Sequence, residues 1–137
     1  MAGYSSTPLA KKLGIKEGFK IKVINGPPYY LTLFTDLPEN ISFDNEGKHK
    51  KDLIHFFTKD ADELSEQIPR LKKEIPPNGI IWVSWPKKTS KVPTDVNEHL
   101  IRDIAIKAGL VDIKVCAVDN IWSGLKLVIP VMYRHKI

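Results

Sequence analysis

Two short, almost wholly apolar runs constrain the fold of this chain more than any other feature of its sequence. Residues 53–57 are apolar except for His55, and residues 80–85 are apolar except for Ser84. Runs of this length without a polar face are typical of strands that are buried on both sides, as in a parallel sheet. Between them, apolar side chains recur at helical spacing, at Leu64, Ile68, Leu71 and Ile75. This succession predicts two parallel strands with a helix packed on one face of the sheet.

Capping residues set the predicted ends of this helix, which spans residues 61–75. Asp60 is predicted to cap it, and Glu63 follows three residues later, which makes an acidic version of the capping box. Pro69 is predicted to kink or restart the helix, because a proline in a helix interior costs about 3 kcal/mol.

A second amphipathic helix is predicted at residues 95–108, with Thr94 or Asp95 as its cap and Gly109 as its stop. Strands are then predicted at residues 112–118 and 125–131. Because only a short segment joins these two strands, they should form an antiparallel hairpin.

The first part of the chain is less regular. A short helix is predicted at residues 6–13, with Thr7 as its cap, Pro8 in its first position and Gly14 at its end. The other predicted elements are a strand at 19–24, a helix at 29–37 and a short strand at 41–43.

Together these elements predict an α/β fold: a Rossmann-like, three-layer domain with a mainly parallel sheet and a C-terminal antiparallel hairpin. A length of 137 residues favours a single domain spanning residues 1–137. There is no apolar signal segment and no run long enough to cross a bilayer. One cysteine, Cys116, leaves no internal disulfide. These features favour a cytoplasmic protein without a membrane partner.

The net charge of +5 is compatible with a polyanionic partner such as nucleic acid. However, the lysines are spread along the chain and arginine, the usual base-reading residue, is scarce. A lysine-rich solvated surface is therefore the favoured interpretation, and nucleic acid is not the favoured partner.

The order of elements over residues 52–131 resembles the latter half of a class I methyltransferase fold, which is Rossmann-like and ends in such a hairpin. The whole chain is also similar to a family of small bacterial proteins known only as a domain of unknown function. The segments that carry this second resemblance are residues 3–5, 8–15, 82–88, 111–119 and 122–126. The family resemblance implies no reaction.

The sequence departs from methyltransferases at their cofactor loop. That loop is glycine-rich, so that the backbone can approach the ligand, whereas residues 25–28 here read Asn-Gly-Pro-Pro. The two prolines remove backbone donors. Asp44 or Glu46 stands where an acidic residue would contact a ribose. We predict no cofactor.

The favoured ligand region is the edge where the strands end. Ser84, Lys87 and Lys88 lie at the end of the strand at 80–85, and Thr94 and Asp95 precede the next helix. In an open α/β sheet, ligands bind beyond the carboxyl ends of the strands, and a helix start favours anions. The two lysines are therefore candidates to contact an anionic group, with Asp95 orienting the helix start. A buried core with solvated lysines is the alternative.

The hairpin segment supplies further candidates, namely Asp119, Trp122 and Ser123. Trp122 would form an apolar wall of the site. The alternative is a turn in which these residues serve only the backbone.

Catalytic patterns are absent from the sequence. The four histidines show no metal-ligand spacing, and Ser84 lacks the glycines of a nucleophile elbow. The favoured function is a non-catalytic binding or interaction module for a small anionic ligand or a protein partner. The alternatives are a small transferase with an S-adenosylmethionine- or nucleotide-like cofactor and a weak, non-specific nucleic-acid binder.

Overall fold

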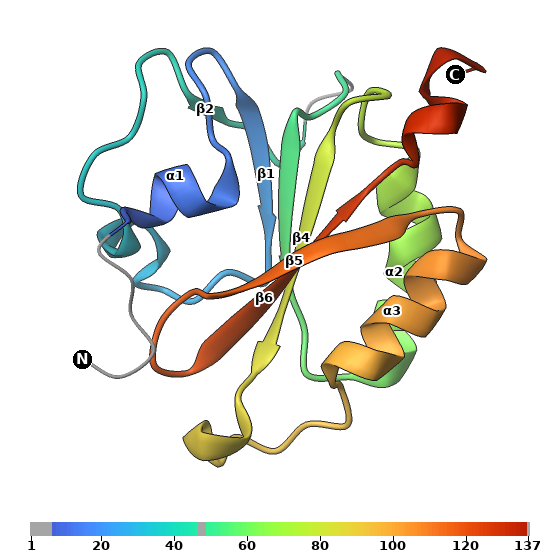
Figure 1. Cartoon of the computed structure of the whole chain (residues 1–137). Coiled ribbons are helices and arrows are strands. Elements are labelled where there is room, and N and C mark those ends of the chain that lie inside the picture. Colours follow the sequence, from blue (N-terminus) through green and yellow to red (C-terminus); the bar gives the residue numbers. More distant parts are fainter. Residues whose placement is uncertain (1–6, 47–48, 137) are drawn as a thin grey trace.

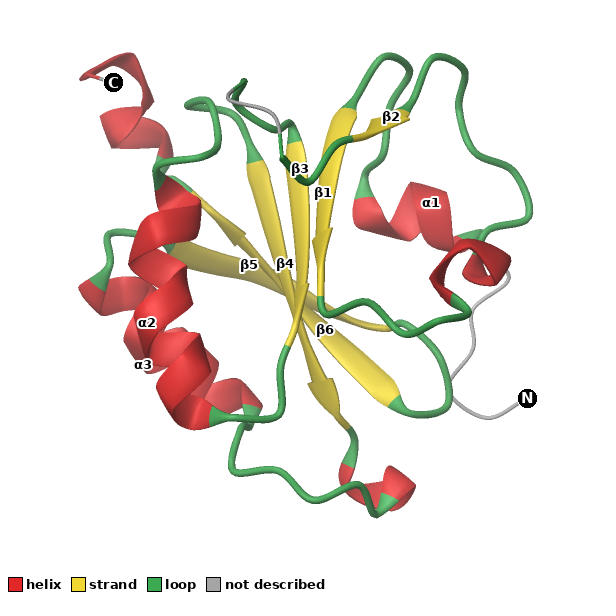
Figure 2. Ribbon diagram, turned by 180° about the vertical axis from the view of Figure 1, so that it is seen from behind, coloured by secondary structure: helices red, strands yellow, loops and turns green. Residues whose placement is uncertain are grey.

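The computed structural model describes residues 7–46 and 49–136. It has three layers, with α2 and α3 on one face of a six-stranded sheet and α1 on the other (Figures 1 and 2). The predicted mainly parallel α/β fold with a closing antiparallel hairpin is confirmed. Within the described residues, no helix is long and apolar enough to cross a membrane.

The strands are β1 (Lys20–Ile24), β2 (Ser42–Phe43), β3 (Leu53–Phe57), β4 (Ile80–Pro86), β5 (Val111–Ala117) and β6 (Trp122–Val128). The helices are α1 (Leu9–Leu13), α2 (Ala61–Lys72) and α3 (Glu98–Lys107), with the 3-10 turns η1 (Tyr30–Leu33), η2 (Lys88–Ser90) and η3 (Val131–Lys136).

The strands lie in the order β2-β1-β3-β4-β6-β5. The first four are parallel, and β6 runs antiparallel between β4 and β5. From β1 the chain moves outward to β2 and then returns to β3 on the other side of β1. The strand order therefore reverses between β1 and β3, and such a switch point opens a crevice beyond the carboxyl ends of the strands.

Alternating side chains of the central strands pack into two hydrophobic cores, one on each face of the sheet. Ile54 and Phe56 pack with α2 and α3 on one face, while Leu53 and Trp82 pack with α1 on the other. The indole Nε1 of Trp82 donates to the carbonyl oxygen of Leu13 at 2.9 Å, which ties α1 to the sheet.

At the start of α2 the predicted cap, Asp60, is confirmed, but the predicted capping box with Glu63 does not form. Asp60 accepts hydrogen bonds from the backbone N–H groups of Asp62 and Glu63. The carboxylate of Glu63 instead accepts from the hydroxyl of Thr58 at 2.8 Å, because the side chain turns toward the end of β3. The helix continues through Pro69 and ends at Lys72 rather than at residue 75.

The predicted cap of α3 is wrong. Asn97 caps this helix and accepts from the N–H of Leu100 at 2.9 Å. Asp95 accepts from the N–H of Ala61 at 2.8 Å, at the start of α2, and the hydroxyl of Thr94 donates to the carbonyl oxygen of Lys59. Both side chains are held by tertiary contacts that local sequence does not reveal.

The N-terminal predictions need correction at two places. Helix α1 begins at Leu9, and Pro8 stands at its N-cap position rather than in its first turn. Gly14 ends it in the left-handed conformation, as predicted (φ 80°). Of the helix expected at residues 29–37, only η1 forms, because the backbone is extended again at Phe34.

The hairpin strands are shifted relative to the prediction. The second strand begins at Trp122, three residues before the expected start, because the turn between β5 and β6 is tighter than the sequence suggested. The N–H groups of Val118 and Asp119 both donate to the carbonyl oxygen of Trp122 across this turn.

Candidate functional site

A cavity of about 490 Å³ opens at the switch point between the carboxyl ends of β1 and β3, and we call it the β1–β3 cavity. Its walls come from the loop after β1, the end of β3, the first turns of α2 and the β5–β6 turn. The lining residues are Asn25, Gly26, Pro27, Pro28, Tyr29, Phe57, Thr58, Lys59, Glu63, Val92, Ile121 and Trp122. This is the edge at which an open α/β sheet binds ligands.

Three aromatic side chains from separate segments form its apolar wall. The rings of Phe57 and Trp122 meet edge to face, with centroids 5.0 Å apart. The hydroxyl of Tyr29 donates to Asp119 Oδ2 at 2.7 Å. Partial burial, together with this bond to a carboxylate, raises the pKa of Tyr29 to about 12, so the phenol stays protonated at neutral pH and holds the two loops together.

The polar side of the cavity centres on the Glu63 carboxylate. Its Oε1 accepts from the Thr58 hydroxyl at 2.8 Å and its Oε2 accepts from the Asn25 amide at 3.1 Å. Both donors are neutral side chains. Asn25 also donates to the Phe57 carbonyl oxygen at 3.1 Å and adopts a positive φ of 57°, a conformation that asparagine tolerates better than most residues.

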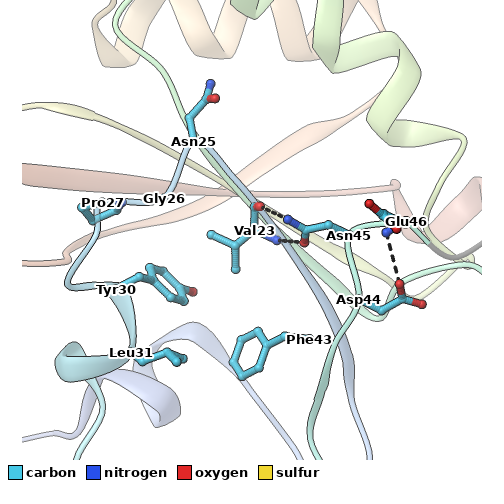
Figure 3. A pocket seen from close by; sticks show the side chains of 10 residues that line it. All are labelled: Val23, Asn25, Gly26, Pro27, Tyr30, Leu31, Phe43, Asp44, Asn45 and Glu46. Atoms are coloured by element: carbon cyan, nitrogen blue, oxygen red, sulfur yellow. Dashed lines mark hydrogen bonds between the residues drawn. The ribbon is translucent and has the colours of Figure 1, made fainter.

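A second cavity, of about 760 Å³, adjoins the first beyond the ends of β1 and β2, and we call it the β1–β2 cavity (Figure 3). Its lining residues are Val23, Asn25, Gly26, Pro27, Tyr30, Leu31, Phe43, Asp44, Asn45 and Glu46. The loop of residues 25–27 belongs to both cavities. We refer to these two adjoining cavities together as the groove.

Gly26 is required where the two cavities meet. A Cβ atom at this position would lie 2.6 Å from Cγ1 of Val23, which is closer than packed atoms can approach. A side chain at this position would force Val23 or the loop to shift.

Carboxylates cluster at the outer end of the groove. Asp44 Oδ1 accepts from the N–H of Glu46 at 3.1 Å, as Figure 3 shows, and Asp44 Oδ2 lies 3.5 Å from the buried ammonium of Lys51. The sequence placed Asp44 or Glu46 where a ribose would be contacted, and both residues line the β1–β2 cavity. The chemistry of this end suits hydroxyl or amine donors.

Behind the groove lies a buried chain of three polar side chains. The Tyr30 hydroxyl is 3.0 Å from His55 Nδ1, and His55 Nε2 is 2.7 Å from Ser84 Oγ. Burial lowers the pKa of His55 to about 3 and raises that of Tyr30. The imidazole is thus neutral at physiological pH, and Ser84, fully buried, has no surface for a ligand.

The two segments that the sequence analysis nominated do meet. Ser84 pairs with Gly124, Trp85 with Ser123 and Pro86 with Trp122 along β4 and β6. The N–H of Lys87 donates to the carbonyl oxygen of Ile121 at 2.7 Å.

The nominated residues differ in their relation to the groove. Trp122 lines the β1–β3 cavity, and Asp119 supports it through Tyr29 and through the N–H groups of Ile121 and Trp122. Lys87, Lys88, Thr94, Asp95 and Ser123 line neither cavity. Lys88 belongs to η2, which projects beyond the end of β4 (Figure 1).

Sequence reasoning missed the residues that make most of the wall, Tyr29, Phe57, Asn25 and Glu63. Phe57 was assigned to the core, and Glu63 to a capping box. The available signal was positional, because the segments after β1 and β3 flank the expected reversal of strand order.

Solved structures similar to this one include several methyltransferases. The structure of DhpI in complex with SAH has a TM-score of 0.60 and 9% sequence identity, covering 90% of this chain and 83% of that one. An S-adenosylmethionine-dependent methyltransferase from Clostridium acetobutylicum has a TM-score of 0.57 and 9% identity, covering 88% and 87%. Magnesium protoporphyrin IX methyltransferase (ChlM) from Synechocystis PCC 6803, with bound SAM, has a TM-score of 0.59 and 12% identity, covering 88% and 74%.

At these identities the similarity establishes the fold alone, and it confirms the methyltransferase-like order of elements. None of the curated proteins matches this sequence. The model of one protein family, described as "Protein of unknown function (DUF3052)", matches residues 35–131, which is more than half of the chain. In agreement with the resemblance noted from its sequence, the chain belongs to this family, DUF3052.

Proposed function

We propose that this chain is a non-catalytic binding module that holds a small molecule in the β1–β3 cavity. The observation that carries the proposal is the convergence of Tyr29, Phe57 and Trp122, from three separate segments, on a cavity of about 490 Å³ at the switch point of the sheet. A concave, mainly apolar site with a few fixed polar groups is the usual form of a small-molecule site.

The lining defines the ligand by its chemistry. The aromatic wall suits a flat ring, and the carboxylate oxygens of Glu63 suit a hydroxyl or amine donor at its rim. Lys59 is the one lysine of the lining and would contact an anionic substituent. Lys87 and Lys88, at the same end of the sheet, would contact any part of the ligand that extends beyond the cavity.

The absence of catalysis is part of the proposal. His55, which lies behind the groove, is buried and neutral, so it cannot exchange protons with a bound molecule at neutral pH. The groups that reach the groove hold one another through hydrogen bonds, as Glu63 does with Asn25.

A second candidate is a small transferase with an adenosyl cofactor. It is favoured by the adjoining β1–β2 cavity, whose rim carries Asp44 and Glu46 beside apolar Leu31 and Phe43. Carboxylates at this position would accept hydrogen bonds from ribose hydroxyls. The structures named above with bound SAM or SAH have the same fold. Pro27 and Pro28 count against it, because a proline offers no N–H to a ligand.

Thermal-shift measurements test both candidates. The panel holds S-adenosylmethionine, S-adenosylhomocysteine, adenosine, nucleotides and sugar phosphates. A ligand at about a hundred times its dissociation constant adds about 2.7 kcal/mol of stability, which moves the midpoint by several degrees. The shift should disappear in Trp122→Ala and persist in Tyr133→Ala, which removes an exposed aromatic side chain outside the groove.

The outcomes separate the candidates. A shift with adenosyl compounds that is lost in Asp44→Asn with Glu46→Gln, followed by methyl transfer to an acceptor, would establish the transferase. A shift lost in Trp122→Ala but kept in the carboxylate variant would support the binding module. A panel without any shift, or shifts unaffected by Trp122→Ala, would contradict the proposed site.

A further inference from the structure

Four lysines lie on the α1 side of the sheet, opposite α2 and α3, and Arg134 acts electrostatically on one of them. These five cations come from five separate segments: Lys12 in α1, Lys16 in the loop after it, Lys114 in β5, Lys126 in β6 and Arg134 in η3. None of them lines the groove described above. We call this group the Lys126 cluster.

The register of the strands places the central pair. Lys126 is the partner of Trp82 on one side and of Lys114 on the other. Side chains of directly paired residues share a face, and Trp82 packs into the α1 core. Both lysines are therefore on the α1 face, side by side.

The other three cations act electrostatically on this pair or on its neighbour Cys116. A Cβ atom at Gly14 would lie 4.0 Å from the Lys126 ammonium, which puts that ammonium beside the end of α1. Lys16 and Arg134 repel the charge on Lys126. The positive charges of Lys12 and Lys114 both act to lower the pKa of the neighbouring Cys116 thiol.

This arrangement is unfavourable in the free protein. Like charges directly opposite each other on paired strands destabilise a sheet. Lys126 is also half-buried, and its pKa is lowered first by that burial and then by Lys114, Lys16 and Arg134. Over residues 7–46 and 49–136, no carboxylate forms an ion pair with any member of the cluster.

A bound anion would relieve this repulsion, and the donors are already arranged for it. The Nε of Arg134 donates to the Ile129 carbonyl oxygen at 2.9 Å, which fixes the guanidinium and leaves its terminal N–H groups. A local arrangement that lowers stability without a structural gain is characteristic of a functional site.

We propose that the Lys126 cluster is a second binding site, separate from the groove, for a compact phosphate-bearing anion of the polyphosphate class. The cations come from five segments around the Lys114 and Lys126 pair, which suits several charges on adjacent phosphates. A nucleic-acid strand, with one charge per phosphate, is instead bound by cations that follow its backbone in a groove or stripe.

Calorimetric titration with tripolyphosphate at constant ionic strength tests the site. We expect one molecule bound per chain, and a loss of affinity of about tenfold or more in Lys114→Gln with Lys126→Gln, because charge-assisted hydrogen bonds are lost. The matched control, Lys20→Gln with Lys107→Gln, removes the same charge at exposed positions outside the cluster and should bind as the wild type does. Because Lys114 is exposed, Lys114→Gln alone provides a folded variant if the double substitution disturbs the sheet.

Competition identifies the source of the phosphate. Inorganic phosphate should bind more weakly than tripolyphosphate, and single-stranded DNA should not displace it. Absence of tripolyphosphate binding, equal losses in the cluster and control variants, or tighter and competing binding of DNA would each overturn the proposal. Because no adenosyl or nucleotide ligand of the groove is used, failure here leaves the function proposed for the groove untouched.

Discussion

The surroundings of His55 keep its imidazole uncharged at neutral pH. Its ring lies between Tyr30 and Ser84, stacks on Phe57 with centroids 4.2 Å apart and has no access to water. The residue therefore serves as an uncharged hydrogen-bonding bridge between β3, β4 and η1.

Protonation of His55 should oppose folding. Burial lowers its pKa from 6.5 to about 3, so below pH 6.5 the unfolded chain takes up a proton that the folded chain accepts only near pH 3. The free energy of unfolding should fall as the pH decreases through this range, by about 2–3 kcal/mol from this group at about pH 4.5. Urea denaturation at neutral pH and at this lower pH should show a larger loss for the wild type than for His55→Asn. Equal losses would mean that the ring titrates normally.

Ser84 should matter for stability rather than for ligand binding. Ser84→Ala leaves His55 Nε2 without its partner at 2.7 Å, and an unsatisfied buried polar atom costs about 1–3 kcal/mol. Ser123→Ala, in the neighbouring strand, removes a hydroxyl at a half-buried position and should change stability by less than about 0.5 kcal/mol. Chemical denaturation of both variants measures the difference, and similar values for the two would contradict the bridging role.

Among single residues, the sequence pointed to part of the candidate site. Trp122 and Asp119 were nominated because they flank a turn at the strand-end edge, and both contribute to the β1–β3 cavity. Ser84 was nominated on the same ground, yet its place inside an apolar run already indicated burial. Tyr29 and Asn25 were not nominated, because their roles depend on contacts with Asp119 and Glu63, distant in sequence.

Among the elements, α2 contains a local conflict. Pro69 lies inside the helix, so it offers no N–H to the carbonyl of Ser65, four residues earlier. The exposed position of Pro69 lets water solvate that carbonyl, and the packing of Leu64, Ile68 and Leu71 keeps the helix in place. This explains why the predicted interruption does not occur.

Removing the conflict should stabilise the protein. We expect Pro69→Ala to raise the free energy of unfolding by about 1–3 kcal/mol. An interior proline destabilises a helix by about 3 kcal/mol. By restricting the unfolded chain, the same proline stabilises the folded state by less than about 1 kcal/mol. Pro93→Ala, in a loop, removes only this restriction of the unfolded chain and should not stabilise. A Pro69→Ala variant that is less stable than the wild type would show that the proline is accommodated without cost.

Element types were more predictable than their ends. Strands β3 and β4 follow from continuous apolar runs and helices α2 and α3 from apolar periodicity, and both signals depend only on neighbouring residues. The cap of α3 did not follow, because Asp95 is engaged by the start of α2 and Asn97 takes its role. A helix at residues 29–37 was predicted from apolar content, but Thr32 bonds back to the Tyr29 carbonyl and the chain becomes extended at Phe34.

Over the whole molecule, the sheet should be most stable at its centre. All five residues of β3 are buried, and this strand is paired on both sides. Strand β2 has two residues, both exposed, at an edge. Hydrogen exchange followed by mass spectrometry should therefore find the slowest amides in β3 and β4 and fast exchange in β2. Comparable protection of β2 and β3 would indicate that something covers this edge in solution.

Beyond the end of β2, a side chain pairs with the exposed backbone edge of β1. Beyond Phe43 the strand stops, and the amide of Asn45 takes its place: Oδ1 accepts from the N–H of Val23 at 3.0 Å and Nδ2 donates to the carbonyl oxygen of Val23 at 2.9 Å. An open row of backbone groups at this point would invite a strand from another molecule. Because Asn45 occupies both backbone groups of Val23, a strand from another molecule cannot form hydrogen bonds with this residue. The groove can therefore stay open to small molecules at this edge without promoting aggregation.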